Sequence, residues 1–190
     1  ILTAITLIAG LGLGLVHEIT LNPIAQAQEK AKKEAWQAVF PDAKLDEFKE
    51  TDVDQKAAKQ AISDLGVNAT IDEVCTVGDT GYVITTTDKD GYGGDIQVSV
   101  GIQSDGTVTG VSFLSLSETA GLGMKAQTDS FKSQFKGLVD GIKVAKNSAD
   151  HDSNEILALT GATITSNAVT TAVNEALANY KTITENGGAN

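Results

Sequence analysis

Residues 71–116 read IDEVCTVGDTGYVITTTDKDGYGGDIQVSVGIQSDGTVTGVSFLSL, and this stretch decides the fold class. Its separators GDTG, DKDGYGGD and QSDG are typical of turns, because glycine and aspartate accept the backbone angles that tight turns require. Between these turns, runs rich in β-branched and aromatic residues predict strands. We therefore predict an antiparallel meander of about four strands, over residues 71–77, 82–87, 96–102 and 108–116.

Helices are predicted before and after this meander in the sequence. Apolar residues at steps of three and four predict a helix from about Pro23 to Phe40, which Pro41 ends. A weaker helix is predicted over 56–65, closed by Gly66.

After the meander we predict a short helix over 130–138, a strand over 142–145 and a final helix over 167–180 with one apolar stripe. The predicted fold class is α+β, an antiparallel sheet with helices packed on it.

Composition narrows the classes of partner and site. The 190-residue chain has a formal net charge of -11, which argues against nucleic acid as a partner. The single cysteine, Cys75, lies in an apolar strand pattern and is expected to be a small buried residue. The two histidines, His17 and His151, have no spacing typical of a metal site, so no metal is predicted.

The first sixteen residues, ILTAITLIAGLGLGLV, contain no charge. A membrane-spanning helix needs about 20 apolar residues, and the recorded chain starts without methionine, so we expect preceding residues to complete the span. We predict a transmembrane helix over 1–21, a helical connecting region over 22–66 and a folded domain over 67–190. A cleaved signal peptide is the alternative for the apolar run. The absence of Lys and Arg before Lys30 favours a position of the domain outside the cytoplasm.

A second informative stretch is LALTGATITSNAVTTAVNEAL, residues 157–177, where hydroxyl side chains precede the final helix. Thr165, Ser166 or Asn167 can cap that helix. The free amides and the positive dipole end of a helix start form a natural anion site. Gly161 allows close backbone approach and Ala162 adds little bulk. Three roles are therefore possible for the hydroxyl groups of this stretch: ordinary helix capping, binding of a phosphate, or covalent attachment of a group. The hydroxyl groups are those of Thr160, Thr163, Thr165 and Ser166.

TGAT followed by ITS resembles the [Ser/Thr]-Gly-Ala-Thr flavinylation motif of the FMN-binding domain family. This family is shared by the RnfG subunit of the Rnf complex and the NqrC subunit of sodium-pumping NADH:quinone reductase. SETAGLGMK, residues 117–125, also resembles the family's Glu-Thr-Pro-Gly-Leu-Gly segment, and the order of features is similar along nearly the whole chain. The resemblance implies that 67–190 is an FMN-binding domain. It also implies that a flavin transferase attaches FMN to Thr163 through a phosphoester.

This chain departs from the family pattern at three positions. Ala120 replaces the usual proline of the Glu-Thr segment, and Leu116 stands where a histidine is frequent. Leu157 stands where an aspartate commonly precedes the tetrapeptide, which bears on recognition by the transferase.

The resemblance also implies roles for residues outside the tetrapeptide. Glu118 and Thr119 are expected to hydrogen-bond the flavin ring or the ribityl chain, and Leu122 to offer apolar surface. Gly121 and Gly123 would let their loop lie against the flavin. Two further residues complete the predicted site: Lys125, which would balance negative charge, and Tyr92, whose Gly-rich turn either lines the cofactor or is simply a hairpin. No catalytic residue is expected, because the flavin itself carries the redox chemistry.

The function that the resemblance implies is electron relay in an RnfG-type subunit. Such a complex couples electron transfer between reduced ferredoxin and NAD to Na⁺ or H⁺ movement. The expected partners are the other Rnf subunits, especially the integral-membrane flavinylated one, together with membrane lipid and, during maturation, the flavin transferase. The alternatives are a stand-alone membrane-anchored flavinylated carrier, an NqrC-like subunit and a flavin-free tethered binding module.

Overall fold

The computed structural model describes residues 2–187, which divide between two compact units that meet at Glu34 and Ala35. Helix α1 (Leu2–Val39) forms the first unit as far as Glu34, and its last residues, from Ala35 on, belong to the second unit. The helix continues through Pro23, so the predicted start of a separate helix at Pro23 is wrong. Among the residues that the structure describes, no helix is long and apolar enough to cross a membrane. The transmembrane helix over 1–21 and the boundaries at 21/22 and 66/67 stay predictions.

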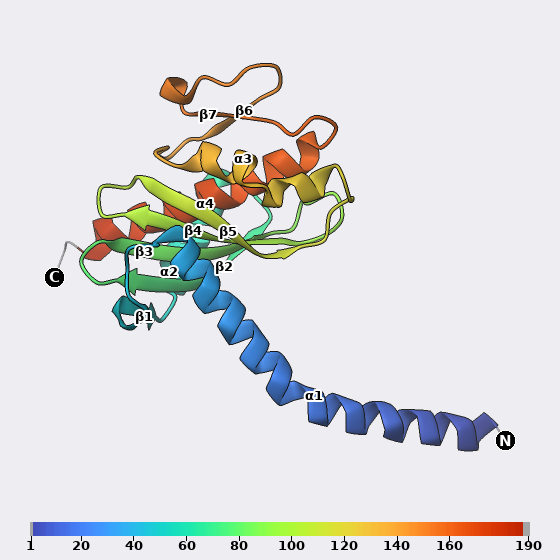
Figure 1. The fold of residues 1–190 in the computed structure, drawn as a ribbon. Helices are drawn as coiled ribbons and strands as arrows, with labels where there is room; N and C mark the ends of the chain where they lie inside the picture. The colour runs from blue at the N-terminus through green and yellow to red at the C-terminus, as the bar shows by residue number, and fades with distance from the viewer. Residues whose placement is uncertain (1, 188–190) are drawn as a thin grey trace. The chain divides into compact units, whose positions relative to one another are not determined.

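The second unit is built on a five-stranded antiparallel sheet whose strands follow one another in sequence order (Figure 1). The predicted meander is confirmed, and each of its four strands lies within two residues of the predicted bounds. A further strand, Phe48–Thr51, pairs with the first strand of the meander and was not predicted. The strands are β1 (Phe48–Thr51), β2 (Ala69–Val77), β3 (Gly81–Asp88), β4 (Ile96–Gln103) and β5 (Val108–Leu116).

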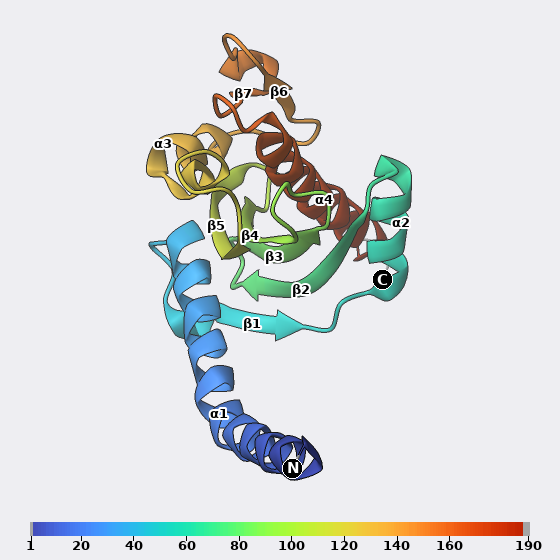
Figure 2. The ribbon, with the colours of Figure 1, turned by 90° about the vertical axis from the view of Figure 1, so that its right-hand side faces the viewer.

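One face of the sheet is covered by α4 (Thr163–Gly187), with α2 (Gln55–Leu65) beside it (Figure 2). The Thr86 hydroxyl of β3 donates to the carbonyl of Ala172 at 3.0 Å, which ties this face to α4. Gly66 ends α2 in the left-handed region with φ 65, as predicted from its position. Burial of each large apolar side chain contributes about 1.5–3 kcal/mol. The largest buried sheet residues of this core are Ile84, Ile96 and Ile102.

A second, smaller core involves the last turn of α1. The rings of Trp36 and Phe48 stack with centroids 5.7 Å apart. Val39 lies against Gly101, where an added Cβ would come within 2.9 Å of the Val39 Cβ. Cys75 is fully buried in this cluster, which confirms the expectation of a small interior residue.

The segment between the sheet and α4 forms a separate excursion. After the loop that follows β5 and a 3-10 segment, Gly123–Gln127, come the α-helical turn α3 (Asp129–Lys132) and the 3-10 turn η3 (Ser133–Phe135), where a single helix over 130–138 was predicted. The rings of Phe131 and Phe135 are buried, so this segment is anchored in the main core. Two short strands, β6 (Lys143–Ala145) and β7 (Glu155–Leu157), then pair in parallel, and only β6 was predicted.

The start of α4 differs most from the prediction. The helix begins at Thr163 and not at Asn167, because the Ser166 amide already donates to the Ala162 carbonyl at 3.0 Å. Thr165, Ser166 and Asn167 therefore lie inside the helix, and their predicted role as its N-cap is wrong. The hydroxyl-rich stretch forms the first helical turn itself.

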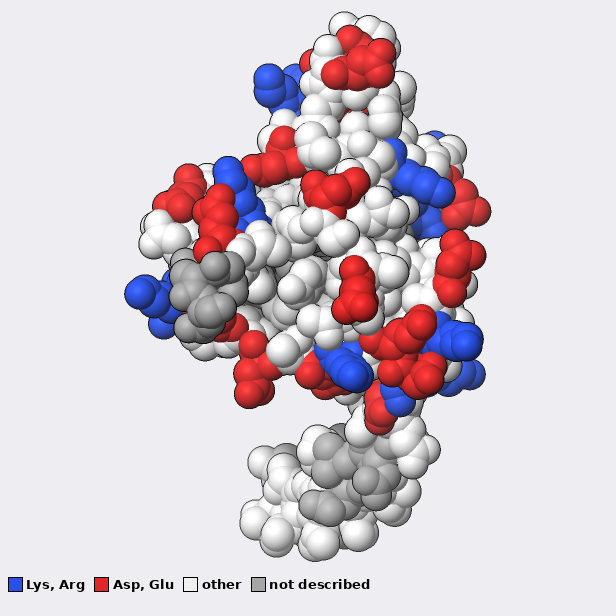
Figure 3. Space-filling view, turned by 90° about the vertical axis from the view of Figure 1, so that its left-hand side faces the viewer, with Lys and Arg blue, Asp and Glu red and all other residues white. Residues whose placement is uncertain are grey.

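Charged side chains are mixed over the surface. Figure 3 shows acidic side chains scattered over the visible face, with lysines among them. The excess of negative charge is thus not gathered into a single site on this face.

Candidate functional site

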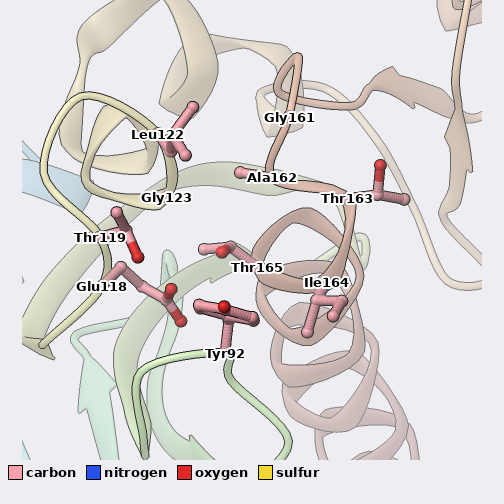
Figure 4. Close-up of a pocket in the computed structure, with 10 residues that line it drawn as sticks. All are labelled: Tyr92, Glu118, Thr119, Leu122, Gly123, Gly161, Ala162, Thr163, Ile164 and Thr165. Atoms are coloured by element: carbon pink, nitrogen blue, oxygen red, sulfur yellow. The ribbon is translucent and has the colours of Figure 1, made fainter.

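A pocket of about 470 Å³ lies at the N-terminal end of α4. Figure 4 shows that three segments form its walls: the loop before β4, the loop after β5, and the turn that leads into α4. Its size falls within the range of about 300–1,000 Å³ usual for small-molecule sites. The lining residues are Tyr92, Glu118, Thr119, Leu122, Gly123, Gly161, Ala162, Thr163, Ile164 and Thr165.

The turn into α4 is tight and well bonded. The Ala162 amide donates to the Leu159 carbonyl at 2.9 Å, and Gly161 takes a φ of 78 that other residues rarely adopt. The first bond within the helix comes from the Ser166 amide. The amides of Thr163, Ile164 and Thr165 therefore precede the helical bonding pattern and point toward the helix entrance. An anion at this entrance is favoured by these amides and by the helix dipole.

The loop that carries Tyr92 is held against the loop after β5. The Gly93 amide donates to Glu118 Oε1 at 3.2 Å. A Cβ at Gly93 would lie 2.1 Å from the Ser117 carbonyl oxygen, so only glycine allows this approach. Tyr92 is thereby held at the rim of the pocket, where its side chain is 69% exposed.

Gly123 brings the loop after β5 onto the first turn of α4. A Cβ at this position would lie 2.6 Å from Thr165 Oγ1 and 2.7 Å from Glu118 Oε2, so both oxygens flank the glycine. The second of these, Glu118 Oε2, is buried and has no hydrogen-bond partner within residues 2–187. A buried acceptor without a partner on a pocket wall is a place for a ligand N–H or O–H.

The structure brings most of the predicted site residues together around this pocket, and three lie elsewhere. Thr160 is exposed in the turn, and Lys125 is exposed in the 3-10 segment η2 (Gly123–Gln127). Ser166 is fully buried and bonds the backbone of the turn. Whether the lining residues bind FMN stays a prediction.

Ile164 lines the pocket with a 52% exposed side chain and was not predicted. Its position between Thr163 and Thr165 in the first helical turn is the signal that could have found it, once the helix start is placed at Thr163.

The fold and this site define the class of an FMN-binding domain, since the profile of the FMN-binding domain family matches residues 91–178. The RnfG subunit of the Na⁺-translocating ferredoxin:NAD⁺ oxidoreductase complex of Acetobacterium woodii is 33% identical, over 97% of this chain and 91% of its own length. The RnfG subunit of the proton-translocating complex of Clostridium ljungdahlii is 36% identical, over 96% of this chain and 90% of its own length. The chain therefore belongs to the RnfG family of subunits of ion-translocating oxidoreductase complexes, as the sequence motifs predicted.

Solved structures share the fold at lower identity. The NqrC subunit from Parabacteroides distasonis has a TM-score of 0.51 and 23% identity, over 70% of this chain and 67% of its own. NqrC from Shewanella oneidensis has a TM-score of 0.52 and 21% identity, over 62% of this chain and 61% of its own. These likenesses support the α+β fold and say nothing further about the site.

Proposed function

We propose that this chain is the flavin-carrying electron-transfer subunit of an Rnf-type complex, which relays electrons between reduced ferredoxin and NAD as Na⁺ or H⁺ is moved. Family membership supports this function, because its relatives are named as subunits of ferredoxin:NAD⁺ oxidoreductase complexes. The observation that carries the proposal is the position of Thr163, the first residue of α4, on a pocket whose wall holds an unpartnered carboxyl oxygen.

The residues around the pocket fit FMN. A phosphate esterified to Thr163 Oγ would lie by the amides of the first helical turn, which favour negative charge. Glu118 Oε2 would accept a hydrogen bond from a donor on the flavin. Tyr92, Leu122 and Ile164 offer exposed apolar surface at the pocket. The bound flavin supplies the electron-carrying chemistry, and the protein supplies anchoring and orientation.

Attachment through Thr163 requires an activated phosphate. The proposed donor is a flavin dinucleotide such as FAD, presented by a flavin transferase. The threonine oxygen forms a bond to the FMN phosphorus, the phosphoanhydride bond breaks, AMP leaves, and the threonine proton is released. No electrons are exchanged in this step. The Thr163 side chain is half-buried at the end of the helix and not in the core, which suits reaction in the folded domain.

We propose that residues 1–21 anchor the chain in the membrane, with the flavin domain on the extracytoplasmic side. The anchor is supported by the family of ion-translocating complex subunits and by the apolar first turns of α1. The side of the membrane is supported by the absence of Lys and Arg before Lys30. The side chains of Leu2, Leu7 and Leu13 are 62–78% exposed within this unit, so they have no protein core to enter. The proposed partners are lipid and the other Rnf subunits, including the integral-membrane flavinylated one.

The attachment is tested by Thr163→Ala in cells that contain the flavin transferase. We expect a folded chain without covalent flavin, read as the loss of flavin fluorescence from the denatured band in a gel. Thr171→Ala is the matched control, because it removes a hydroxyl of the same helix that lies outside the TGAT tetrapeptide and does not line the pocket. Fluorescence that survives in Thr163→Ala would refute Thr163 as the attachment point.

Purification in mild detergent separates the subunit function from the alternatives. Co-purification of the chain with several integral-membrane proteins supports an Rnf-type complex. A lone yellow chain would favour the stand-alone carrier, and a colourless chain would favour the binding module.

A further inference from the structure

Ser166 is one of the three predicted site residues that do not line the pocket, yet it makes two hydrogen bonds to the turn that leads into α4. Its Oγ accepts the Leu159 amide at 2.9 Å and donates to the Ala162 carbonyl at 2.9 Å. Leu159 and Ala162 are the two ends of the turn that leads into α4. One hydroxyl therefore bridges both ends of the turn to the first turn of the helix.

The rest of the approach segment is held independently. Gln134 accepts the Leu157 amide at 2.7 Å and donates to the Leu157 carbonyl at 3.4 Å. Downstream, Asn174 exchanges two hydrogen bonds of 2.9 Å with the backbone of Ile142. Loss of the Ser166 hydroxyl would therefore remove two of the hydrogen bonds that hold the Leu159–Ala162 turn, while the neighbouring segments keep their own bonds.

The position of Thr163 depends on this turn. Thr163 directly follows Ala162, whose carbonyl accepts both the Ser166 amide and the Ser166 hydroxyl. Ser166 is fully buried, so no water competes for its two bonds. If these bonds are absent, the Leu159 amide loses its acceptor and the turn gains other conformations.

We propose that Ser166 is a positioning residue for flavin attachment: its hydroxyl locks the Leu159–Ala162 turn and thereby fixes the place of Thr163 Oγ for reaction. This inference rests on the proposed function. It assigns to Ser166 a role in the attachment step that is separate from any contact with the flavin. Misplacement of a reacting oxygen by about 1 Å can slow a reaction by roughly 100-fold.

The test compares Ser166→Ala with Thr170→Val in the full-length chain. Thr170 is the matched control, because its buried hydroxyl donates to the Ser166 carbonyl at 2.8 Å in the same helix but does not touch the turn. Each variant is incubated with FAD and the transferase, and the initial rate of covalent flavin incorporation is measured by mass spectrometry. Hydrogen exchange of the Leu159 amide is followed in the same chains without FAD.

We expect Ser166→Ala to incorporate flavin at least about 10-fold more slowly than the wild type, with faster exchange at Leu159. Thr170→Val should keep both the rate and the exchange of the wild type. Equal slowing in the two variants would show a general loss of helix packing and overturn the proposal. A wild-type rate in Ser166→Ala would overturn it as well.

The two proposals fail in different ways. A wild-type chain that accepts no flavin contradicts covalent attachment itself, and the positioning role falls with it. A wild-type chain that is modified normally, while Ser166→Ala is modified just as fast, leaves the proposed function standing and removes only the role of Ser166.

Discussion

Gly123 is the residue on which the shape of the pocket depends most directly. Its missing side chain leaves room for Thr165 Oγ1 and Glu118 Oε2. A Cβ at this position would lie 2.6 Å from the first oxygen and 2.7 Å from the second. Contacts this short require the neighbouring side chains or the backbone to move. The residue therefore links the packing of the loop to the availability of a carboxyl oxygen for a ligand.

Gly123→Ala is expected to reduce flavin incorporation and to lower the free energy of unfolding by about 1–3 kcal/mol, because the added methyl overpacks the pocket wall. Gly110→Ala is the control, since its Cβ would meet Val39 only at an ordinary distance of 3.7 Å. Denaturant unfolding and the flavin content of each chain measure the two effects. Equal stability and equal flavin content in the two variants would show that the space around Gly123 does not limit the size of its side chain.

Glu175 lies on α4 away from the pocket and is fully buried. Both of its carboxyl oxygens lack a hydrogen-bond partner within the described chain, and so do both amide atoms of Asn179 one turn later. Burial raises the pKa of Glu175 from 4.5 to about 9, and the nearby acids Asp88, Asp90 and Asp72 contribute to this rise. The side chain is therefore protonated in the folded state at neutral pH.

This raised pKa makes stability depend on pH. Below about pH 4.5 the carboxyl is protonated in both states and has no effect. Between that pH and about 9 the unfolded chain has lost the proton and the folded chain keeps it, so the free energy of unfolding falls as pH rises. The fall is on the order of 1 kcal/mol per pH unit. Above about pH 9 the carboxyl is ionised in both states, and its contribution no longer changes with pH.

Glu175→Gln should remove this loss, and its stability should fall less steeply than that of the wild type across the neutral range. Glu185→Gln is the control, because it removes an exposed carboxyl from the same helix and should leave the wild-type profile unchanged. Urea unfolding at a series of pH values provides the comparison. Parallel profiles for the wild type and Glu175→Gln would contradict a buried protonated Glu175.

At the scale of elements, the sequence predicted the strands and helices whose apolar residues recur at a regular spacing. The four long strands are rich in β-branched residues between clear turns, and the apolar stripe of α4 follows one side of a helix. Strand β1 was missed because three of its four residues are exposed, so it has no alternating pattern to detect. Strand β7 has three residues and owes its place to pairing with β6, which local sequence does not encode.

The predicted start of α4 failed for a related reason. Hydroxyl residues are typical of the position before a helix, and the sequence does not show that Ser166 bonds back to residues 159 and 162 from within the first turn. The pocket residues were found through motifs. Lys125 was predicted to belong to the site, but in the structure it does not line the pocket. It lies in the 3-10 segment η2 with its side chain exposed.

Helix α2 supplies a prediction at this scale. The Asp54 side chain accepts the amides of Lys56 and Ala57 and so caps the helix that lies beside α4. Asp54→Ala should lower the free energy of unfolding by about 1 kcal/mol, whereas Asp52→Ala removes the same charge from an exposed loop and should have little effect. Thermal unfolding of both variants measures the difference. Equal losses would remove capping as the cause.

At the scale of the whole molecule, the chain joins an apolar helical unit to a folded unit that holds the complete pocket. Every residue that lines the pocket lies within 35–190, so the site does not depend on the first unit. We propose that the first unit is held by a membrane and that the second carries the cofactor.

A chain that begins at Asn22 is therefore expected to stay in the supernatant after ultracentrifugation of cell membranes, while the full chain sediments with them. Flavin incorporation by the truncated chain, measured with purified transferase and FAD, should match that of the full chain. Sedimentation of the truncated chain with membranes would contradict an anchor within residues 1–21.

The most direct measurement is the mass of the peptide that contains Thr163, isolated from the native protein. We predict the mass of the peptide plus one FMN, less one water, with fragment ions that place the addition on Thr163. An unmodified peptide from native material would contradict the covalent flavin carrier.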